Sequence, residues 1–294
     1  MNLCPEALEV NVRRALEEDL GDVGDLTVAA SLPSGSSGEA VILTRQAGVL
    51  AGVPIARACF QALDADVVFG EGDLSDGAEL MPDGVIMTVR GSAAALLSAE
   101  RTALNFLQRM SGIATCTASF VAAVEGCDVK ILDTRKTTPL LREFEKYAVL
   151  VGGGTNHRIG LFDQILLKEN HFSLSGQPYQ QVVEAAVALA TAPVVAEAQT
   201  LEEGLAAVAG GASIVLLDNF QPGPDLRATA DSLRRAAAER GRAVEIEASG
   251  GVTLASVRAF AECGVDRISV GVLTHSVDAL DMSMATTALP KGLL

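Results

Sequence analysis

Six short apolar runs recur in the second half of the chain, and helical segments separate them. The runs are β-branched and leucine-rich with little strict alternation, which is typical of strands buried on both faces. They cover residues 129–134, 164–170, 193–199, 213–219, 243–249 and 266–271. The spacing of apolar residues between them predicts helices over 177–190, 201–209, 225–240 and 253–263. Repeated strand–helix alternation predicts parallel βα units, here in an incomplete, open βα barrel of about six parallel strands.

The first part of the chain has a different pattern. An amphipathic helix is expected over 6–20, followed at 21–27 by a turn that we interpret as a helix cap. Short β-like runs around a helix at 54–63 predict an α+β, sandwich-like domain on an antiparallel sheet; they cover 39–46, 48–52, 65–72 and 84–91.

Residues 92–124 read as helical, with a break expected at Gly112 between two helices. This region joins the two parts of the chain. We therefore predict an N-terminal domain over 1–112, joined by the C-terminal tail 275–294, and a catalytic barrel over 113–274.

Composition limits the classes of function. The net charge is −15 and no basic segment stands out, so we expect no nucleic-acid partner. No apolar run reaches ~18 residues, so we expect no membrane span. The five cysteines show no CxxC spacing, which favours free thiols in the cytoplasm and argues against a zinc site.

The stretch from Asp133 to His171 gathers an unusual share of the chain's cations. An acidic protein that concentrates positive charge in one segment favours an anion site there, because local charge decides what a pocket binds. A solvated charged face is the alternative, but the run Gly152–Gly154 and the pair Thr137–Thr138 between the charges favour a binding site. The cationic and histidine side chains are Arg135, Lys136, Arg142, Lys146, His157, Arg158, Lys168 and His171.

Each predicted strand ends in polar residues or glycine, and the active sites of βα barrels lie at these carboxyl ends. Ser249, Gly250 and Gly251 precede a helix expected to begin at Thr253, so a phosphate could bind there. Glu197 and Asp218 end neighbouring strands. Their carboxylates suit Mg²⁺ held together with substrate phosphates, or a pair neutralised by nearby cations, and this choice stays open.

Several motifs together resemble the quinolinate phosphoribosyltransferase family. They are ERTALNFLQRMSGIAT, TRKTTP, GGGTNHR, GLFDQILLKENH, LLDNF, ASGGVT and GVDRISVGVLTHS, in the family's order over nearly the whole chain. The resemblance implies an enzyme that converts quinolinate and phosphoribosyl pyrophosphate into nicotinate mononucleotide, pyrophosphate and carbon dioxide, with Mg²⁺ as cofactor.

The resemblance also implies how quinolinate is held. Arg135 and Arg158 match positions that bind this dicarboxylate, and His157 and Lys136 match positions beside them. Planar guanidinium groups suit the task because they pair with carboxylates through two parallel hydrogen bonds. Arg101 matches an arginine that reaches into the neighbouring subunit's site, which implies a homodimer or an oligomer built from such dimers.

For phosphoribosyl pyrophosphate, the resemblance implies catalytic roles for Lys136 and Lys168 near the anionic groups. Glu197 and Asp218 match the acids around the ribose hydroxyls and the Mg²⁺–pyrophosphate, so they are the expected metal-site residues. The 5′-phosphate would lie against Ser249, Gly250, Gly251 and Gly271.

Two positions depart from the family pattern: Leu140 stands where glycine is expected, and Val195 where a second glutamate is common. Neither change removes a chemical group with an implied role. Three alternatives remain at this point: a paralogue of less certain substrate encoded near molybdate transporters, nicotinate phosphoribosyltransferase, and a barrel that binds without turnover. The intact TRK, NHR and KENH motifs argue against the first, and the retained Lys168, Glu197 and Asp218 against the last.

Overall fold

The computed structural model describes residues 3–290, so residues 1–2 and 291–294 of the two expected end segments lie outside the described residues. The chain divides into two compact units. The sheet unit contains the chain up to Cys116, Glu143–Gly152 and the part from Val277 onward. The barrel unit contains Thr117–Arg142 and Gly153–Ser276.

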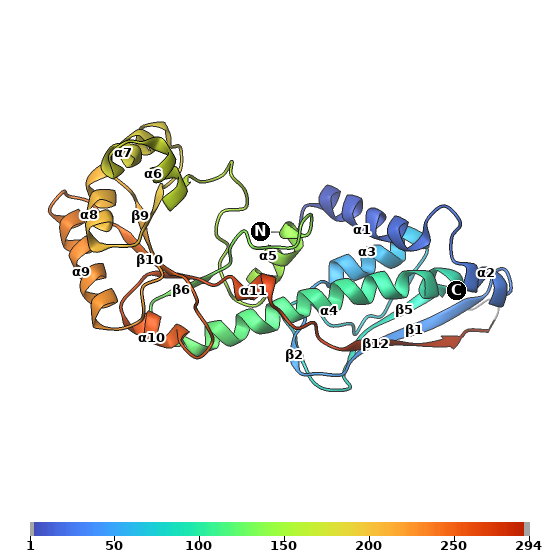
Figure 1. The fold of residues 1–294 in the computed structure, drawn as a ribbon. Coiled ribbons are helices and arrows are strands. Elements are labelled where there is room, and N and C mark those ends of the chain that lie inside the picture. The colour runs from blue at the N-terminus through green and yellow to red at the C-terminus, as the bar shows by residue number, and fades with distance from the viewer. Residues whose placement is uncertain (1–2, 291–294) are drawn as a thin grey trace. The chain divides into compact units, whose positions relative to one another are not determined.

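The sheet unit is an antiparallel sheet with helices, as the sequence predicts (Figure 1). Strand β1 alternates between buried and half-buried side chains, which is the pattern of a strand with one face on a core. The four-stranded sheet has the order β12-β1-β5-β3, and β12 pairs with β1 over its whole length. The elements are α1 (Pro5–Leu20), α2 (Leu26–Ser31), β1 (Ser37–Thr44), β2 (Gly48–Val49), α3 (Val53–Leu63), β3 (Val68–Phe69), β4 (Glu79–Leu80), β5 (Val85–Ser92) and β12 (Met282–Ala288).

The turn before α2 is a helix cap, which confirms the interpretation of residues 21–27. Asp25 is the N-cap of α2 and accepts a hydrogen bond from the Val28 amide at 2.9 Å. That hydrogen bond is the main reason why the pKa of Asp25 lies below its ordinary value.

Helix α4 (Ala93–Ala123) is continuous, so the predicted break at Gly112 is wrong. Gly112 serves close packing instead: a Cβ at this position would collide with the main-chain carbonyl oxygen of Asp278. The glycine therefore lets the segment before β12 lie directly against the helix, and the helix tolerates it because its neighbours are buried and apolar. Met110 and Ile113 beside it have no exposed surface.

Helix α5 (Arg142–Val151) lies inside the cation-rich stretch, and the sequence analysis places no helix there. Its side chains explain why it belongs to the sheet unit. Phe144 meets Phe106 edge to face at 5.6 Å, and Glu145 pairs with Arg109 at 2.8 Å. The Tyr147 hydroxyl donates to Asp76 at 2.7 Å, so the helix has both apolar and polar contacts in this unit.

The barrel unit contains a six-stranded, all-parallel sheet of order β6-β11-β10-β9-β8-β7 that does not close (Figure 1), which confirms the predicted open barrel. Helices α7, α8 and α9 pack in succession beside it. The strands are β6 (Lys130–Leu132), β7 (Leu166–Leu167), β8 (Val195–Ala198), β9 (Ile214–Asp218), β10 (Glu245–Ser249) and β11 (Arg267–Ser269). The helices are α6 (Glu169–Ser175), α7 (Tyr179–Leu189), α8 (Leu201–Gly210), α9 (Pro224–Ala238), α10 (Val257–Glu262) and α11 (Val272–His275). Within residues 3–290, no helix has the length and apolar character needed to cross a membrane.

Candidate active site

The polar side chains at the strand ends sit directly above an apolar layer of the barrel. Side chains two residues apart on a strand share one face of the sheet. Lys168, Glu197 and Asp218 therefore continue the faces that carry Leu166, Val195 and Leu216. The layer below them is a buried cluster of Leu166, Val195, Ile214 and Leu216. Val195, where a glutamate is common in the family, is thus a fully buried member of this apolar layer.

Lys168 and Glu197 form an ion pair, with Nζ 2.5 Å from Oε2. The Glu197 side chain is 7% exposed and Lys168 is 50% exposed, so the carboxylate lies at the base and the ammonium group reaches solvent. The other carboxylate oxygen, Oε1, accepts the Glu169 main-chain N–H at 3.2 Å. The Tyr179 hydroxyl donates to the main-chain carbonyl of Glu197 at 2.6 Å, which fixes the strand end from behind.

Asp218 lies close enough to this pair for its pKa to respond. Burial raises the pKa of Asp218, and the negative charge of Glu197 raises it further, while Lys168 and Lys136 act in the opposite direction with smaller effect. The Asn219 amide donates to Asp218 Oδ2 at 2.7 Å. The site therefore holds a carboxylate whose ionised form is disfavoured and that a bound cation would stabilise.

We expect Asp218→Asn to raise the thermal stability of the unliganded protein at pH 7. A raised pKa in the folded state means that the folded protein binds this proton more tightly than the unfolded chain does. The stability due to this proton is present below the ordinary value of 3.8 and is lost as the pH rises through the raised value. The difference in melting temperature between Asp218→Asn and the wild type, measured by calorimetry, should therefore shrink as the pH falls toward 3.8.

Asp231→Asn, at an exposed position on α9, is the control for this experiment. It changes the net charge equally and should leave the melting temperature unchanged, because substitutions at such surface sites usually have little effect. An equal gain in both variants would show that overall charge repulsion, and not the local site, causes the effect.

The two loops that carry the arginines are tied to each other. Asp133, fully buried after β6, accepts hydrogen bonds from the His157 amide at 2.8 Å and the Asn156 side chain at 2.5 Å. Arg142 donates to the Thr137 hydroxyl and to the Ile159 carbonyl, both at 3.0 Å. The segments after Asp133 and after Thr155 are therefore held at fixed separation.

Arg135 and Arg158 are the cationic ends of these two loops. Burial lowers the pKa of Arg158, and the positive charge of Arg135 lowers it further, although Asp163 acts in the opposite direction. Arg158, whose charge is disfavoured, thus lies beside a second guanidinium group, and a bound dianion would stabilise this arrangement. His157 is 8% exposed and lies behind them.

The glycines at the strand ends have two different structural reasons. Gly250 and Gly251 have φ values of +101° and +60°, which side chains rarely allow, and a Cβ on Gly250 would collide with Asn219. Gly271 has an ordinary φ of −68°, and its neighbours pack closely, because a Cβ there would lie 3.0 Å from His275 Nε2 and 3.2 Å from Lys136 Cδ. Both loops thus bring main chain near the Lys136 and Asp218 side of the site.

The helix expected to begin at Thr253 begins at Val257 instead. Residues before it form a turn in which the Thr253 amide and hydroxyl contact the Ser256 hydroxyl at 3.0 and 3.1 Å. Such side-chain hydrogen bonds compete with helix formation. The helix end is therefore further from Gly251 than predicted, and the glycine loop itself must supply the N–H groups for a phosphate.

Leu140 has a φ of +68° and is 77% exposed, so it adopts a left-handed conformation without burying its side chain. For a non-glycine residue this conformation costs about 1–2 kcal/mol. Glycine would remove that cost but add about 0.5–1 kcal/mol of chain entropy in the unfolded state. We expect Leu140→Gly to stabilise the protein by up to ~1 kcal/mol in denaturant unfolding. Leu140→Ala, which keeps the Cβ, should give no gain; an equal gain would mean that the exposed side chain is responsible.

Of the twelve residues to which the family resemblance assigns a role at the site, Arg101 is the one that lies outside the barrel unit. It is an exposed residue of α4 in the sheet unit. The barrel unit contains the other eleven, and Figure 1 labels three of the strands in this unit, β6, β9 and β10. They are Arg135, Lys136, His157, Arg158, Lys168, Glu197, Asp218, Ser249, Gly250, Gly251 and Gly271.

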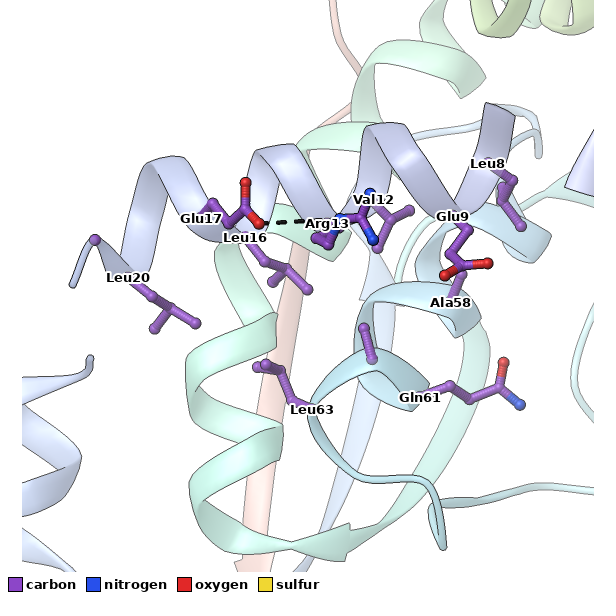
Figure 2. A pocket seen from close by; sticks show the side chains of 12 residues that line it. Leu8, Glu9, Val12, Arg13, Leu16, Glu17, Leu20, Ala58, Gln61 and Leu63 are labelled. Atoms are coloured by element: carbon purple, nitrogen blue, oxygen red, sulfur yellow. Dashed lines mark ion pairs between the residues drawn. The ribbon is translucent and has the colours of Figure 1, made fainter. Parts of the chain in front are cut away.

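A groove of about 540 Å³ lies between α1 and α3, but its side chains do not suit an anion-binding site (Figure 2). Its walls are mainly apolar, including Leu16, Leu20 and Leu63, and its one ion pair joins Arg13 to Glu17 on the exposed side of α1. It offers no cluster of cations for a dicarboxylate or a pyrophosphate.

The structure adds charged residues that the sequence analysis does not single out. Glu247 on β10 is fully buried and its carboxylate meets Arg267 and Ser269 on β11. Its Oε1 also lies 3.3 Å from His157 Nε2. The available signal was the alternation of Glu245 and Glu247 with apolar residues in one strand, which puts two acids on one face.

Two family models match this chain and together cover most of it. "Quinolinate phosphoribosyl transferase, C-terminal domain" matches residues 113–285, and the N-terminal domain of the same family matches residues 25–111.

Curated relatives and solved structures agree with these matches. The chain is 42% identical over 273 residues to "Probable nicotinate-nucleotide pyrophosphorylase [carboxylating]" of Bacillus subtilis, covering 92% of this chain and 90% of that one. It is 40% identical over 285 residues to the "Nicotinate-nucleotide pyrophosphorylase [carboxylating]" of Mycobacterium leprae, covering 95% and 97%. The solved nicotinate-nucleotide pyrophosphorylase of Francisella tularensis superposes with a TM-score of 0.88 at 36% identity, covering 97% and 98%.

Proposed function

The chain belongs to the quinolinate phosphoribosyltransferase family, and from this premise we propose how its residues divide the reaction between two substrates. The protein transfers the phosphoribosyl group of phosphoribosyl pyrophosphate to quinolinate with decarboxylation, in the biosynthesis of NAD. The products are nicotinate mononucleotide, pyrophosphate and carbon dioxide.

Arg135 and Arg158 bind the two carboxylates of quinolinate. The lowered pKa of Arg158, caused first by burial and then by the charge of Arg135, supports this role, because a bound dianion would compensate a partly buried cation that lies beside a second one. Lys136 extends the same positive region toward the second substrate, and its main-chain carbonyl accepts a hydrogen bond from Thr274 at 2.7 Å.

Phosphoribosyl pyrophosphate lies at the other strand ends. The main chain at Ser249, Gly250, Gly251 and Gly271 receives the 5′-phosphate, which the open space beside Gly251 supports. Lys168 contacts the pyrophosphate, and Glu197 and Asp218 face the ribose ring. The ion pair between Lys168 and Glu197 presents one charge of each sign at the point where a C–O bond must break.

Mg²⁺ is the proposed cofactor, bound through the substrate pyrophosphate. Among residues 3–290, no group of three or more histidine, cysteine or carboxylate side chains could hold a metal alone. Two nearby carboxylates, Glu197 and Asp218, fit a Mg²⁺ that also takes oxygens from the phosphates and water. The raised pKa of Asp218 supports this fit. Lys168 and Lys136 offset only part of the effect of burial and of Glu197 on the ionised carboxylate, and a bound cation would add to their effect. When bound, Mg²⁺ would neutralise charge on the departing pyrophosphate.

The reaction then needs positioning and electrostatic stabilisation rather than a protein nucleophile. The bond from C1′ to the pyrophosphate oxygen breaks with its electron pair on the oxygen, and Lys168 stabilises that charge. Glu197 and Asp218 stabilise the positive charge that develops on the ribose. The quinolinate nitrogen bonds to C1′, the adjacent carboxylate leaves as carbon dioxide, and its electron pair on the ring takes up a proton.

Arg101 completes the quinolinate site of a second subunit in a homodimer. It is exposed on α4, and its side chain makes no hydrogen bond or ion pair within residues 3–290, as expected of a side chain whose partner lies elsewhere. We also propose a cytoplasmic location, which the five free cysteines support.

The test is a turnover assay with quinolinate, phosphoribosyl pyrophosphate and Mg²⁺ that follows nicotinate mononucleotide and carbon dioxide, with nicotinate as a parallel substrate. We expect product from quinolinate alone and none when the metal is chelated. Product only from nicotinate would overturn the dicarboxylate site but keep the phosphate site. No product from either substrate would favour the paralogue or a binding protein.

A further inference from the structure

Glu247 is a buried carboxylate that the proposed reaction does not use. It lies on β10 with no exposed surface. Its Oε1 accepts a hydrogen bond from Ser269, and its Oε2 lies 3.0 Å from Arg267 Nε. Burial raises the pKa of Glu247, but the neighbouring His157, Arg267 and Ser269 outweigh it, so the pKa is lowered overall. The group therefore stays a carboxylate, and a buried charge of this kind is costly unless it is paired.

The ring of His157 has its two nitrogens directed at different protein groups. Nδ1 accepts the main-chain N–H of Arg158 at 2.7 Å, so Nδ1 carries no proton. Nε2 lies 3.3 Å from Glu247 Oε1, which makes it the nitrogen that bears the proton. The Nε2 side of the His157 ring thus faces the carboxylate, the arrangement by which acidic neighbours commonly fix a histidine tautomer.

This tautomer bears on the conformation of Arg158. The amide of His157 donates to Asp133 at 2.8 Å and the amide of Arg158 donates to the ring, so both peptide groups of the turn are held. The Arg158 guanidinium donates to the Gln164 carbonyl at 3.1 Å. With a proton on Nδ1 instead, the Arg158 amide would lose its acceptor and face an N–H group.

We propose that Glu247 is a positioning residue for quinolinate binding: it keeps the proton of His157 on Nε2, so that Nδ1 accepts the Arg158 amide and the guanidinium is directed at a substrate carboxylate. The proposal rests on the proposed role of Arg158. It gives His157 a supporting place behind Arg158 instead of the direct contact with quinolinate that the sequence implies.

The first test replaces the charge with minimal change of shape. Glu247→Gln should raise the KM for quinolinate about 10-fold or more, the loss typical when a supporting partner of a site histidine is changed. The affinity for phosphoribosyl pyrophosphate should stay within about twofold, since the side-chain partners of Glu247 are His157, Arg267 and Ser269, and none of these is proposed to bind that substrate. Glu245→Gln is the matched control, because Glu245 is on the same strand and pairs with the same Arg267 at 3.2 Å, but its other partner is Lys130.

The second test observes the proton directly and needs no substrate, so it stays decisive if the proposed role of Arg158 fails. The chain has three histidines, which makes the ¹⁵N spectrum of the imidazoles simple to assign. We expect a proton on Nε2 and none on Nδ1 of His157 in the wild type, and a mixture of tautomers in Glu247→Gln. A proton on Nδ1 in the wild type would overturn the proposal.

Two results of the substrate-binding measurements would contradict the proposal. An unchanged KM for quinolinate in Glu247→Gln, or an equal loss of both substrates, would overturn the positioning role, the latter because it indicates damage to the whole unit. Should Glu247→Gln fail to fold, Ser269→Ala removes one hydrogen bond to the carboxylate while keeping its charge. That variant should raise the KM for quinolinate about threefold without changing the affinity for phosphoribosyl pyrophosphate.

Discussion

Arg158→Ala is expected to weaken quinolinate binding by about 30-fold to several thousand-fold, and to leave phosphoribosyl pyrophosphate binding within about twofold. The range corresponds to about 2–5 kcal/mol for removing one partner of a partly buried charge pair. Arg158 is expected to show the larger loss of the two arginines, because its guanidinium is partly buried while Arg135 is exposed. Arg135→Ala should change binding in the same direction.

Titration calorimetry with each substrate separately measures this selectivity. Arg158→Lys keeps the charge but loses the planar fork, so it should bind quinolinate with intermediate affinity. Arg258→Ala, an exposed arginine of α10 whose side chain pairs with Glu262, is the control and should bind both substrates normally. Loss of both substrates in Arg158→Ala, or of neither, would contradict the assignment of Arg158 to quinolinate.

The six barrel strands could be predicted because a parallel strand buried on both faces is a compact, local signal in the sequence. Helices α7, α8 and α9 were predictable for a similar reason, since each has an apolar stripe and a terminating residue. The break at Gly112 was predicted wrongly because local rules read glycine as a helix stop. The need for a glycine there comes from Asp278, which is distant in sequence.

Helix α5 illustrates the opposite failure. Its charged residues read as part of an anion site, yet Glu145 and Lys146 are fully buried, and Glu145 pairs with Arg109 in the sheet unit. Sequence alone could assign this charge to a ligand or to a structural partner, and nothing local distinguishes the two. The cations that do belong to the candidate site are those at the strand ends, because the fold places all of these ends at the same edge of the sheet.

Glu247 was missed because the strand at 243–249 was read as apolar, with little weight on alternation. In an open barrel, residues that alternate along a strand face the interior and the helices in turn. Glu245, Glu247 and Ser249 therefore share one face, and the last of them is in the proposed phosphate loop. The two glutamates are paired by Arg267 of β11. This contact depends on the tertiary structure and cannot be read from the strand's own sequence.

Lys168→Met is expected to lower kcat by about 100- to 1,000-fold, or roughly 2.7–4 kcal/mol of transition-state stabilisation. The reason is that Lys168 is the exposed partner of the Lys168–Glu197 pair, so its ammonium group is available to the departing pyrophosphate. The KM for quinolinate should change little, because its proposed ligands are the arginines on the other two loops. Steady-state kinetics with saturating Mg²⁺ measures both quantities.

A loss of rate in Lys168→Met has two possible causes. One is the loss of a cation beside the leaving group, and the other is that Glu197, 7% exposed, is left without its ion-pair partner. The double variant Lys168→Met/Glu197→Gln separates them. If Lys168 stabilises the leaving group, the double variant regains thermal stability lost by the single one but stays at least about 100-fold slower than the wild type. If Lys168 only neutralises Glu197, removing that carboxylate restores much of kcat. Recovery of the rate would therefore contradict a direct role for Lys168 in pyrophosphate departure.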